Sequence, residues 1–335
     1  MKYVVTGGNG FIGSHIVDQL INDNHEVHVI DNLSAEEHHQ FYYNDKAKYH
    51  EIDICSTGTI ETIMAGSDAV FHLAAEARIQ PCIHNPLIAV ENNTKGTASV
   101  LQAARLAGVR RVIYSSSSSI YGQAHKTSLR EDIHPDCLNP YSVSKKAGED
   151  LCRMYARLYD METVILRYFN VYGPRQPLKG QYAPVVGLFL RQYRDNEPLT
   201  IVGSGKQRRD FTHVYDVVDA NIKFVRAKKP GWTNEGCKHW RWNWGDVFNV
   251  GTGVNYSINE IVSWFSDYPT KTLPERPGES NETLANISKI RSAINWKPEK
   301  NLHDYMIDEI EKVGREKSLD EMVKISQEIG EYEKS

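Results

Sequence analysis

The stretch VVTGGNGFIGSHIVDQLI, residues 4–21, joins an apolar run, a glycine-rich turn and a helical pattern. Its glycines fall at positions 7, 10 and 13, a G-x-x-G-x-x-G spacing. Glycine permits a tight turn, lets the backbone approach a diphosphate and allows a helix to pack closely on a strand. The N-terminus of the following helix presents free N–H groups and the positive end of its dipole to an anion. This strand–turn–helix pattern therefore predicts a dinucleotide site.

Two later strand ends extend this prediction. The run EVHVID, residues 26–31, ends in Asp31, 18 residues after Gly13. A carboxylate there accepts the ribose hydroxyls of NAD and repels the additional phosphate of NADP, so NAD is favoured. The alternative is that Asp31 is only a turn residue of DNLS, residues 31–34. The run KYHEID, residues 48–53, leads to Asp53 and Ile54, where an adenine ring would rest.

The first two thirds of the chain alternate strand and helix patterns. Helical patterns at 12–22, 59–64 and 87–107 lie between strand candidates at 2–7, 26–31, 48–53, 69–75, 111–116 and 162–168. Nearly continuous apolar strands are typical of a parallel sheet covered on both faces. The alternation predicts an α/β fold with a doubly wound parallel (Rossmann) sheet. We expect residues 1–172 to form this core, with 209–255 returning to it, and 173–335 to form mainly a smaller, substrate-binding lobe.

Composition limits the class of function. The net charge of −4 shows no basic excess, so nucleic acid is not an expected partner. Five cysteines form neither a C-x-x-C pair nor a metal-ligand spacing, which favours reduced thiols in the cytoplasm and predicts no metal site. The first residues lack the pattern of a signal peptide, and no apolar run approaches the ~20 residues of a membrane helix.

The stretch VIYSSSSSIYG, residues 112–122, holds five consecutive serines. Serine runs are common in linkers, but this one follows an apolar strand, so it lies at the sheet edge where ligands bind. Tyr141 and Lys145 follow one helical turn apart in NPYSVSKKAGEDLCRMYA, 24 residues after Ser117. A tyrosine–lysine pair alone is a weak signal, but together with the serines and the dinucleotide motif it indicates an active site.

Eight motifs, spread over residues 2 to about 296, resemble those of the extended short-chain dehydrogenase/reductase family: TGGNGFIG, DNLS, HLAA, SSSSSIYG, YSVSK, RYFNVYGPRQ, RRDFTHVYD and RPGES. Within this family the sequence is most similar to NAD-dependent nucleotide-sugar epimerases of the UDP-glucose/UDP-N-acetylglucosamine 4-epimerase type. The resemblance implies epimerisation at C4 of a UDP-sugar, UDP-N-acetylglucosamine and/or UDP-glucose, through a transient 4-keto sugar.

The resemblance also assigns catalytic roles. Tyr141, as phenolate, would take the proton of the sugar 4-hydroxyl while hydride passes to NAD, and Ser117 would hydrogen-bond the same hydroxyl. The charges of Lys145 and of the oxidised nicotinamide would lower the pKa of Tyr141 from its ordinary value of about 10. The 4-keto sugar would then rotate and take the hydride back on its other face.

One departure separates related activities. Sugar 4,6-dehydratases of this family carry Asp-Glu after the catalytic threonine, and decarboxylases keep the Glu. Here these positions are Ser118 and Ser119, which cannot serve as an acid or base, so both activities are disfavoured. An epimerase for another nucleotide sugar, such as a UDP-uronic acid, stays open. So does an NAD-binding sensor without turnover, although such proteins tend to lose the tyrosine–lysine pair.

Residue by residue, the resemblance implies two binding sets. The cofactor set is Gly7, Gly10, Phe11, Ile12, Gly13, Asp31, Asn32, Leu33, Ser34, Asp53, Ile54, Leu73, Ala74, Ala75, Asn93, Ser115, Tyr141, Lys145 and Phe169. The substrate set is Ser117, Tyr141, Asn170, Arg209, Arg276, Glu279 and Thr283. Asn170 and the two arginines would hold the diphosphate and Glu279 the nucleotide ribose. The small Thr283 would leave room for an N-acetyl group, unless it merely faces solvent in a turn.

The remaining segments carry weaker expectations. Residues 228–246 hold four of the six tryptophans and are interpreted as a surface insertion. Residues 301–335 are interpreted as solvated helices. The family resemblance implies a homodimer formed by the helices at 87–107 and 141–159. The second helix offers a stripe of Leu151, Met154, Tyr155 and Leu158, with burial against its own sheet as the alternative.

Overall fold

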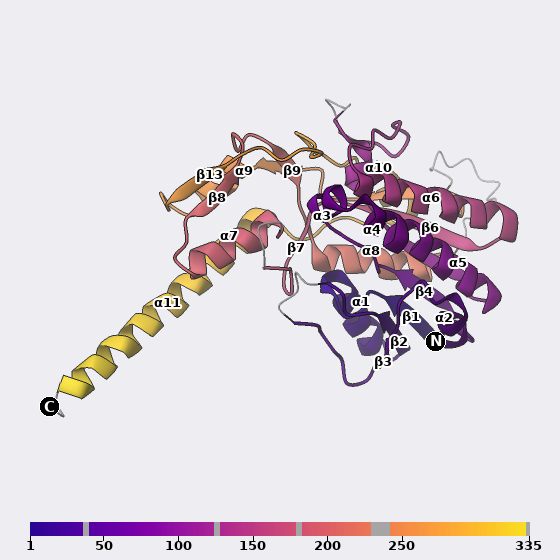
Figure 1. Ribbon diagram of the computed structural model, residues 1–335, viewed down its shortest axis with the longest axis horizontal. Coiled ribbons are helices and arrows are strands. Elements are labelled where there is room, and N and C mark those ends of the chain that lie inside the picture. Colours follow the sequence, from indigo (N-terminus) through magenta and orange to yellow (C-terminus); the bar gives the residue numbers. More distant parts are fainter. Residues whose placement is uncertain (36–39, 124–127, 179–182, 229–241, 333–335) are drawn as a thin grey trace.

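The computed structural model describes residues 1–35, 40–123, 128–178, 183–228 and 242–332, and side-chain surroundings up to residue 317. At its centre lies one sheet of seven parallel strands in the order β11–β6–β5–β4–β1–β2–β3 (Figure 1). The strands are β1 (Lys2–Thr6), β2 (Glu26–Asp31), β3 (Lys48–Glu51), β4 (Ala69–His72), β5 (Arg111–Ser117), β6 (Glu162–Tyr168) and β11 (Val247–Val250). The order reverses direction at β1, so the predicted doubly wound sheet is confirmed.

Helices cover both faces of this sheet. One layer contains α1 (Phe11–Asn22), α8 (Val214–Arg226) and α10 (Ser288–Ile294), and the other contains α2 (Thr57–Met64), α5 (Gly96–Leu106) and α6 (Pro140–Tyr159). Successive strand residues supply the two layers: Val5 packs with the first and Val4 with the second. Both are fully buried, which explains why the strands are apolar without alternation.

The helix expected at 87–107 is interrupted. It consists of α4 (Pro86–Ile88), a π-helical segment η1 (Ala89–Lys95) and α5. A π-helical turn holds more residues than an α-helical one, so it changes which side chains face a given direction. As a result Asn92 lines a cavity at the sheet edge, and its neighbour Asn93 is buried behind it.

A smaller lobe follows the sheet. It contains α7 (Val185–Arg194), β8 (Leu199–Val202), β9 (Arg208–Asp210), β12 (Asn255–Ser257), α9 (Ile258–Ser263) and β13 (Thr270–Leu273). Strands β8 and β13 pair in parallel, β9 and β12 antiparallel. Strand β7 (Val171–Tyr172) follows β6 of the sheet in the sequence, and β10 (Thr212–His213) follows β9 of the lobe. These two short strands pair in parallel. Phe189 and Phe265 meet edge to face in the lobe's own apolar core.

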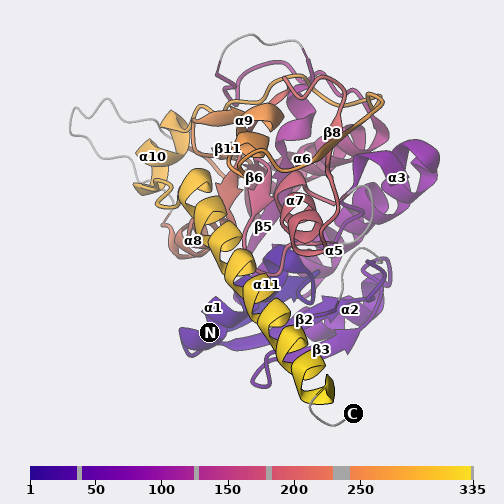
Figure 2. The same cartoon turned by 90° about the vertical axis from the view of Figure 1, so that its left-hand side faces the viewer.

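The C-terminal segment forms a single helix, α11 (Leu302–Tyr332), which extends away from the lobe in Figure 1 and runs toward the viewer's side in Figure 2. The expectation of merely solvated helices is wrong for its first part, because Leu302 and Met306 are buried in the lobe core. Charged residues at the intervening positions conceal this short apolar stripe in the sequence. Neither α11 nor any other helix in the described part of the chain is long and apolar enough to cross a membrane.

The tryptophan-rich stretch is also corrected in part. Trp242 is 3% exposed and packs edge to face on Phe224 and Phe248 in the core. Trp244 lies against Trp242, and the Arg111 guanidinium stacks on its ring at 4.6 Å. These two tryptophans therefore cover the start of β5 rather than belonging to a surface insertion. Residues 229–241 lie outside the described residues.

Candidate active site

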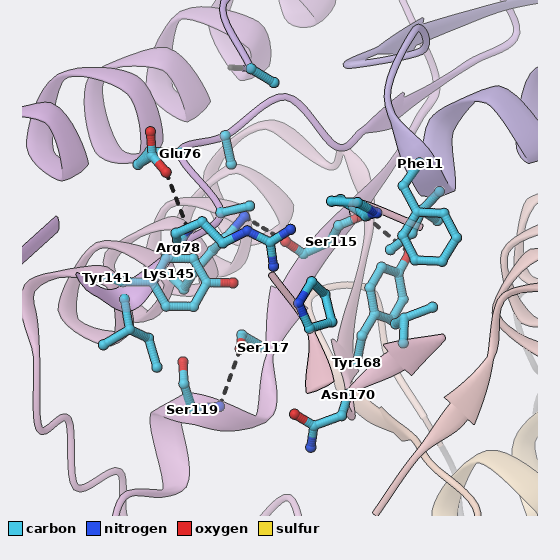
Figure 3. Close-up of a pocket in the computed structure, with 18 of the residues that line it drawn as sticks. Phe11, Glu76, Arg78, Ser115, Ser117, Ser119, Tyr141, Lys145, Tyr168 and Asn170 are labelled. Carbon is cyan, nitrogen blue, oxygen red and sulfur yellow. Dashed lines mark hydrogen bonds between the residues drawn. The ribbon is translucent and has the colours of Figure 1, made fainter. Parts of the chain in front are cut away.

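A cavity of about 550 Å³ opens at the carboxyl ends of the central strands and continues into the smaller lobe. Figure 3 shows its catalytic end, where side chains from the sheet, from α6 and from the loop after β4 point toward one another. Most of the predicted residues line this cavity: Gly7, Gly10, Phe11, Ile12, Gly13, Asp31, Asn32, Ser34, Asp53, Ile54, Leu73, Ala74, Ala75, Ser115, Ser117, Tyr141, Lys145, Asn170, Arg209, Arg276, Glu279 and Thr283.

The glycine turn between β1 and α1 has the form that a diphosphate site requires. Gly7 has a φ of +70°, and a Cβ on Gly13 would overlap the Gly7 carbonyl oxygen. The N-cap residue of α1 is Gly10, which has no side chain to cap the helix, so the first N–H groups of α1 remain available to a ligand. These glycines therefore form a cradle that any side chain would fill, and the cradle fits the diphosphate of NAD.

Asp31 supports this turn from the end of β2. Its carboxylate accepts hydrogen bonds from the backbone N–H groups of Asn9 and Leu33, both at 3.0 Å. Asp31 thus has a structural role in the turn, as the alternative interpretation holds, and it also lines the cavity. Nearby, the Asp53 carboxylate accepts hydrogen bonds from the Asn32 side chain and the Cys55 backbone.

The tyrosine and lysine are carried by the first turns of α6. A reciprocal hydrogen-bonded cap between Asn139 and Ser142 fixes where this helix begins. Lys145 Nζ donates to the Ser115 carbonyl at 3.0 Å and lies 6.0 Å from the centre of the Tyr141 ring. Burial lowers the pKa of Lys145 to about 8, so it is still mainly charged at pH 7.

The ionisation of Tyr141 depends on groups that act in opposite directions. Burial raises its pKa in the protein chain alone, while a hydrogen bond with Ser117 and the positive charge of Arg78 act in the opposite direction. Arg78 is a cation that the sequence had not pointed to, and the lowering of this pKa by Lys145 and the oxidised nicotinamide stays a prediction for the site with NAD bound. Burial has this effect because a phenolate loses hydration energy in a buried site unless donors or cations replace it.

The serine run has a different task at each position. Ser115 Oγ hydrogen-bonds the Tyr168 hydroxyl at 3.0 Å, and Ser116 Oγ donates to Glu149 at 2.7 Å. Ser117 ends β5 in the cavity, where its Oγ accepts from the Ser119 backbone N–H at 3.2 Å. Residues Ser118–Tyr121 form a 3-10 turn, η2, so the run is an ordered wall of the site and not a linker.

Three predicted residues do not line the cavity. Asn93 is 1% exposed, and its side chain holds the backbone of Glu76 and the hydroxyl of Ser144. Phe169 is fully buried beside Tyr121, and Leu33 lies outside the cavity wall. For Asn93 and Phe169 the motif is in place but the side chain is buried outside the cavity.

Other lining residues were missed. Glu76 and Arg78 directly follow the HLAA motif and, in Figure 3, their side chains lie at the catalytic end close to Tyr141. Glu76 Oε1 accepts a hydrogen bond from the Arg78 backbone N–H at 3.2 Å. The sequence feature that could have identified them is their position directly after a strand whose carboxyl end lies at the ligand-binding edge of the sheet. Within the described residues, no group of three or more histidine, cysteine or acidic side chains could hold a metal ion.

The far end of the cavity lies in the smaller lobe. Arg209 Nη2 lies 3.8 Å from Glu279 Oε2, and the Asn170 amide donates to the Asp210 carbonyl. Thr283 is 5% exposed, and its hydroxyl accepts from the Asp210 backbone N–H at 3.2 Å. It lines the cavity, so the alternative of a solvent-facing turn residue is wrong.

Comparison with known proteins agrees with this geometry. The model of the NAD dependent epimerase/dehydratase family matches residues 3–251. The chain is 35% identical over 312 residues to the UDP-glucose 4-epimerase of Mycolicibacterium smegmatis, covering 89% of this chain and 94% of that one. A UDP-N-acetylglucosamine 4-epimerase from Methanobrevibacter ruminantium M1, solved with UDP-N-acetylmuramic acid, has a TM-score of 0.82 and 32% identity, covering 92% of this chain and 97% of its own. A UDP-glucuronic acid 4-epimerase from Bacillus cereus, solved with UDP-glucuronic acid and NAD, has a TM-score of 0.80 and 30% identity, covering 94% and 99%.

Proposed function

Since this chain belongs to the NAD-dependent epimerase/dehydratase family, and is an enzyme of the UDP-sugar 4-epimerase type, we propose that it interconverts UDP-N-acetylglucosamine, UDP-glucose or both with their C4 epimers. The cofactor is NAD, whose chemistry when bound is to accept and return a hydride at C4. The observation that carries the proposal is one cavity that joins the glycine cradle to Ser117, Tyr141 and Lys145.

The protein's own groups would handle the proton. Tyr141 would accept it from the sugar 4-hydroxyl, and Ser117 would hydrogen-bond the same oxygen. Lys145, held by the Ser115 carbonyl, keeps a positive charge beneath the tyrosine ring. Positions 118 and 119 offer only hydroxyls, which supports epimerisation over the acid–base steps that water elimination or decarboxylation would require.

The lobe side of the cavity would hold the nucleotide diphosphate. Arg209 and Arg276 are the guanidinium groups that line it there, and guanidinium geometry suits phosphate oxygens. Asn170 would add a neutral donor, and Glu279 would accept from the nucleotide ribose. These roles place the sugar between the lobe and Tyr141, consistent with residues 173–335 being mainly the substrate-binding part.

Thr283 gives a test of sugar size. It is buried and small, so an N-acetyl group at C2 would find room that a tyrosine ring would occupy. Thr283→Tyr should lower kcat/KM for UDP-N-acetylglucosamine more than for UDP-glucose. If the N-acetyl sugar is turned over at an unchanged rate, with fold and NAD content intact, Thr283 does not gate the pocket.

A second candidate substrate is favoured by Arg78. Its guanidinium lies at the catalytic end of the cavity, and the Ser119 hydroxyl there is buried without a hydrogen-bond partner in the described structure. A cation and an unpaired donor suit a carboxylate on the sugar, as in a UDP-uronic acid. UDP-glucuronic acid therefore belongs in the substrate panel.

The deciding experiment is to incubate the purified protein, without added cofactor, with UDP-glucose, UDP-N-acetylglucosamine and UDP-glucuronic acid and to record NMR spectra. Conversion of either neutral sugar, with NAD released on denaturation, supports the proposal. Conversion of the uronic acid alone favours the second candidate. NAD without any conversion would support the alternative of a sensor without turnover.

The assembly we propose is a homodimer. The predicted stripe is wrong in detail, because Tyr155 is 7% exposed and Leu151 and Met154 pack partly against the sheet. The exposed apolar side chains on the same helices are instead Leu87, Val90, Leu106, Val143, Leu158 and Tyr159. This patch on α4, η1, α5 and α6 suits a second copy of the chain. The cytoplasm remains our expectation for its compartment, from the cysteine pattern.

A further inference from the structure

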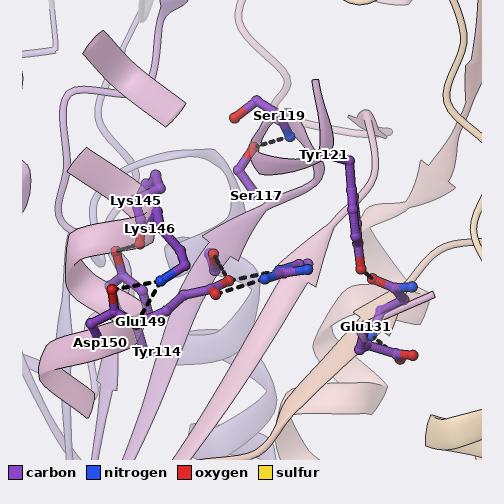
Figure 4. Close-up of polar contacts among 12 residues, drawn as sticks. Tyr114, Ser117, Ser119, Tyr121, Glu131, Lys145, Lys146, Glu149 and Asp150 are labelled. Carbon is purple, nitrogen blue, oxygen red and sulfur yellow. Dashed lines mark hydrogen bonds and ion pairs between the residues drawn. The ribbon is translucent and has the colours of Figure 1, made fainter. Parts of the chain in front are cut away.

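A buried ion pair lies directly behind the catalytic centre. Glu149 and Arg167 are 0% and 1% exposed, and their side chains meet in a two-pronged contact, with Nε to Oε1 at 2.7 Å and Nη2 to Oε2 at 2.8 Å. Ser116 Oγ donates to the same Glu149 Oε1 at 2.7 Å. We call Ser116, Glu149 and Arg167 the Ser116 triad, and Figure 4 shows Glu149 below Ser117.

The three residues belong to α6, β5 and β6, and the first two of these elements carry the catalytic residues. Glu149 is on α6, one turn after Lys145 and two turns after Tyr141. Ser116 is on β5, between Ser115, whose carbonyl holds Lys145, and Ser117. Arg167 is on β6, paired in register with Ser116. The triad therefore ties the helix that carries the tyrosine to the strand that carries the serine.

Stability alone is a weak reason for such a group. Removing two charges from water costs several kcal/mol per ion, and buried ion pairs are often replaced by apolar side chains without loss of stability. Arg167 Nη1 has no hydrogen-bond partner in the described structure, although the guanidinium stacks on the Tyr121 ring at 4.6 Å. Unlike apolar packing, the triad fixes the relative orientation of the elements it joins, because hydrogen bonds require a short distance and a defined angle.

We infer that the Ser116 triad is a positioning device: it fixes β5 against α6 so that Ser117 and Tyr141 meet in the geometry the reaction needs. Glu149 and Arg167 lie outside the cavity lining, and the Ser116 hydroxyl is engaged with Glu149. The inference rests on the proposed epimerase function for its kinetic readout. Displacement of a reacting group by about 1 Å costs roughly 10²-fold in rate, so a small slip of strand against helix would be visible.

The chain contains a matched control. Arg111 on β5 and Glu162 on β6 form a second ion pair, between the two strands that carry Ser116 and Arg167, with Arg111 Nη2 at 2.6 Å from Glu162 Oε2. Arg111 is 2% exposed and Glu162 19%. This pair lies at the start of β5, five residues from Ser116, or about 17 Å along a strand. It shares the two strands and the carboxylate–guanidinium chemistry, but it includes no residue of α6 and lies away from the catalytic centre.

The test compares Glu149→Leu/Arg167→Met with Glu162→Leu/Arg111→Met, together with the mild variant Ser116→Ala. We expect the first double variant to fold, to retain NAD, and to lose roughly 10²-fold in kcat with KM within about twofold. Ser116→Ala should lose roughly tenfold in kcat by the same displacement argument. The control double variant should keep kcat within about threefold of wild type, although its Tm is similar to that of the first double variant. Wild-type kcat in both triad variants, or equal losses in the two double variants, would overturn the inference.

A second readout does not depend on turnover. The pKa of Tyr141 can be followed by ultraviolet absorbance, as the difference between each protein and the same protein carrying Tyr141→Phe. Loosening the Ser117 contact weakens a hydrogen bond that favours the phenolate, so Ser116→Ala should raise this pKa relative to wild type. The control pair should leave it unchanged, and an unchanged pKa in Ser116→Ala contradicts positioning. If the wild-type protein converts no UDP-sugar, the proposed function is wrong. The comparison of Tyr141 pKa values would still test the positioning role of the triad.

Discussion

Tyr141 is the residue whose surroundings determine most of the chemistry. It is half-buried beside Ser117, with Lys145 near its ring and Arg78 nearby. These surroundings act in opposite directions: burial opposes the phenolate, while the Ser117 hydroxyl and the charge of Arg78 favour it. Single substitutions of these residues therefore separate their proposed roles most clearly.

Replacing Tyr141 by Phe should leave NAD bound and lower kcat by roughly 10²–10⁴-fold, because the hydroxyl is the proton acceptor. Ser117→Ala should cost less, roughly 10²-fold, because it removes one supporting hydrogen bond. Both are measured by steady-state kinetics, with NAD content as the control for folding. Near-wild-type turnover of Tyr141→Phe would refute the assigned base.

Arg78 should set the pH dependence of the reaction. Its positive charge lowers the pKa of Tyr141, so Arg78→Gln raises that pKa. The phenolate is the active form, and kcat/KM rises with pH toward this pKa, so the rising limb should move to higher pH and the rate at pH 7 should fall. Arg78→Lys keeps the charge and should move the limb less. A limb that stays in place for both variants would show that Arg78 acts only through contacts with the sugar.

At the scale of elements, the junction of β1 and α1 is the least tolerant point. A Cβ on Gly13 would overlap the Gly7 carbonyl oxygen and crowd Gly8, so α1 could not begin where it does. Helix α2, by contrast, contains Gly58, around which a Cβ would meet no atom within 4 Å. A close backbone contact therefore requires glycine at position 13, whereas no contact requires it at position 58.

Gly13→Ala should therefore abolish retention of NAD during purification and lower the Tm, since the cradle and the packing of α1 change together. Gly58→Ala should keep NAD and stabilise the fold by about 0.5–1 kcal/mol, because alanine favours the helix. Thermal unfolding and the absorbance of released NAD measure both effects. Full NAD content in Gly13→Ala would show that the close approach can relax.

At the scale of the whole molecule, a buried histidine makes stability depend on pH. His72 at the end of β4 is 1% exposed and hydrogen-bonds Thr6 and Thr97, and burial lowers its pKa to about 3. The unfolded chain has an ordinary histidine, pKa about 6.5, so it binds a proton first as pH falls. The lowered folded pKa therefore contributes stability above about pH 6.5 that is lost progressively as pH falls toward 3.

Between pH 7 and pH 5 this residue should cost the protein about 2 kcal/mol of unfolding free energy. The measurement is denaturant unfolding at the two pH values for wild type and His72→Gln. The variant is less stable at pH 7 because its side chain replaces two ring hydrogen bonds imperfectly, but it should lose about 2 kcal/mol less on acidification. Equal losses in both proteins would place the pH dependence elsewhere.

The apolar patch on α4, η1, α5 and α6 makes a second prediction at this scale. Light scattering should give twice the chain mass of 38.1 kDa at micromolar concentration. Leu158→Glu, at a position 67% exposed, should give monomers because a charge in the contact loses its hydration. Val254→Glu, 51% exposed at a site away from these helices, should leave the dimer intact. A monomeric wild-type protein would contradict the proposed assembly.

The sequence by itself determined the elements whose signals are local. Apolar strands, the G-x-x-G-x-x-G turn from Gly7 to Gly13, and the tyrosine–lysine spacing on α6 each depend on residues a few positions apart. Such patterns reflect backbone conformation and periodicity, which hold before any distant contact forms. For the same reason the doubly wound sheet and most of the cavity wall could be predicted.

Only the tertiary structure decided which of two neighbouring residues faces the cavity. The π-helical turn of η1 presents Asn92 instead of Asn93, and Arg78 reaches Tyr141 although 63 residues separate them. Trp242 and Met306 are buried because distant elements cover them, although their own segments read as polar. Side-chain direction at a loop or a non-standard turn, and burial by a remote partner, depend on the path of the whole chain, and periodicity carries no information about that path.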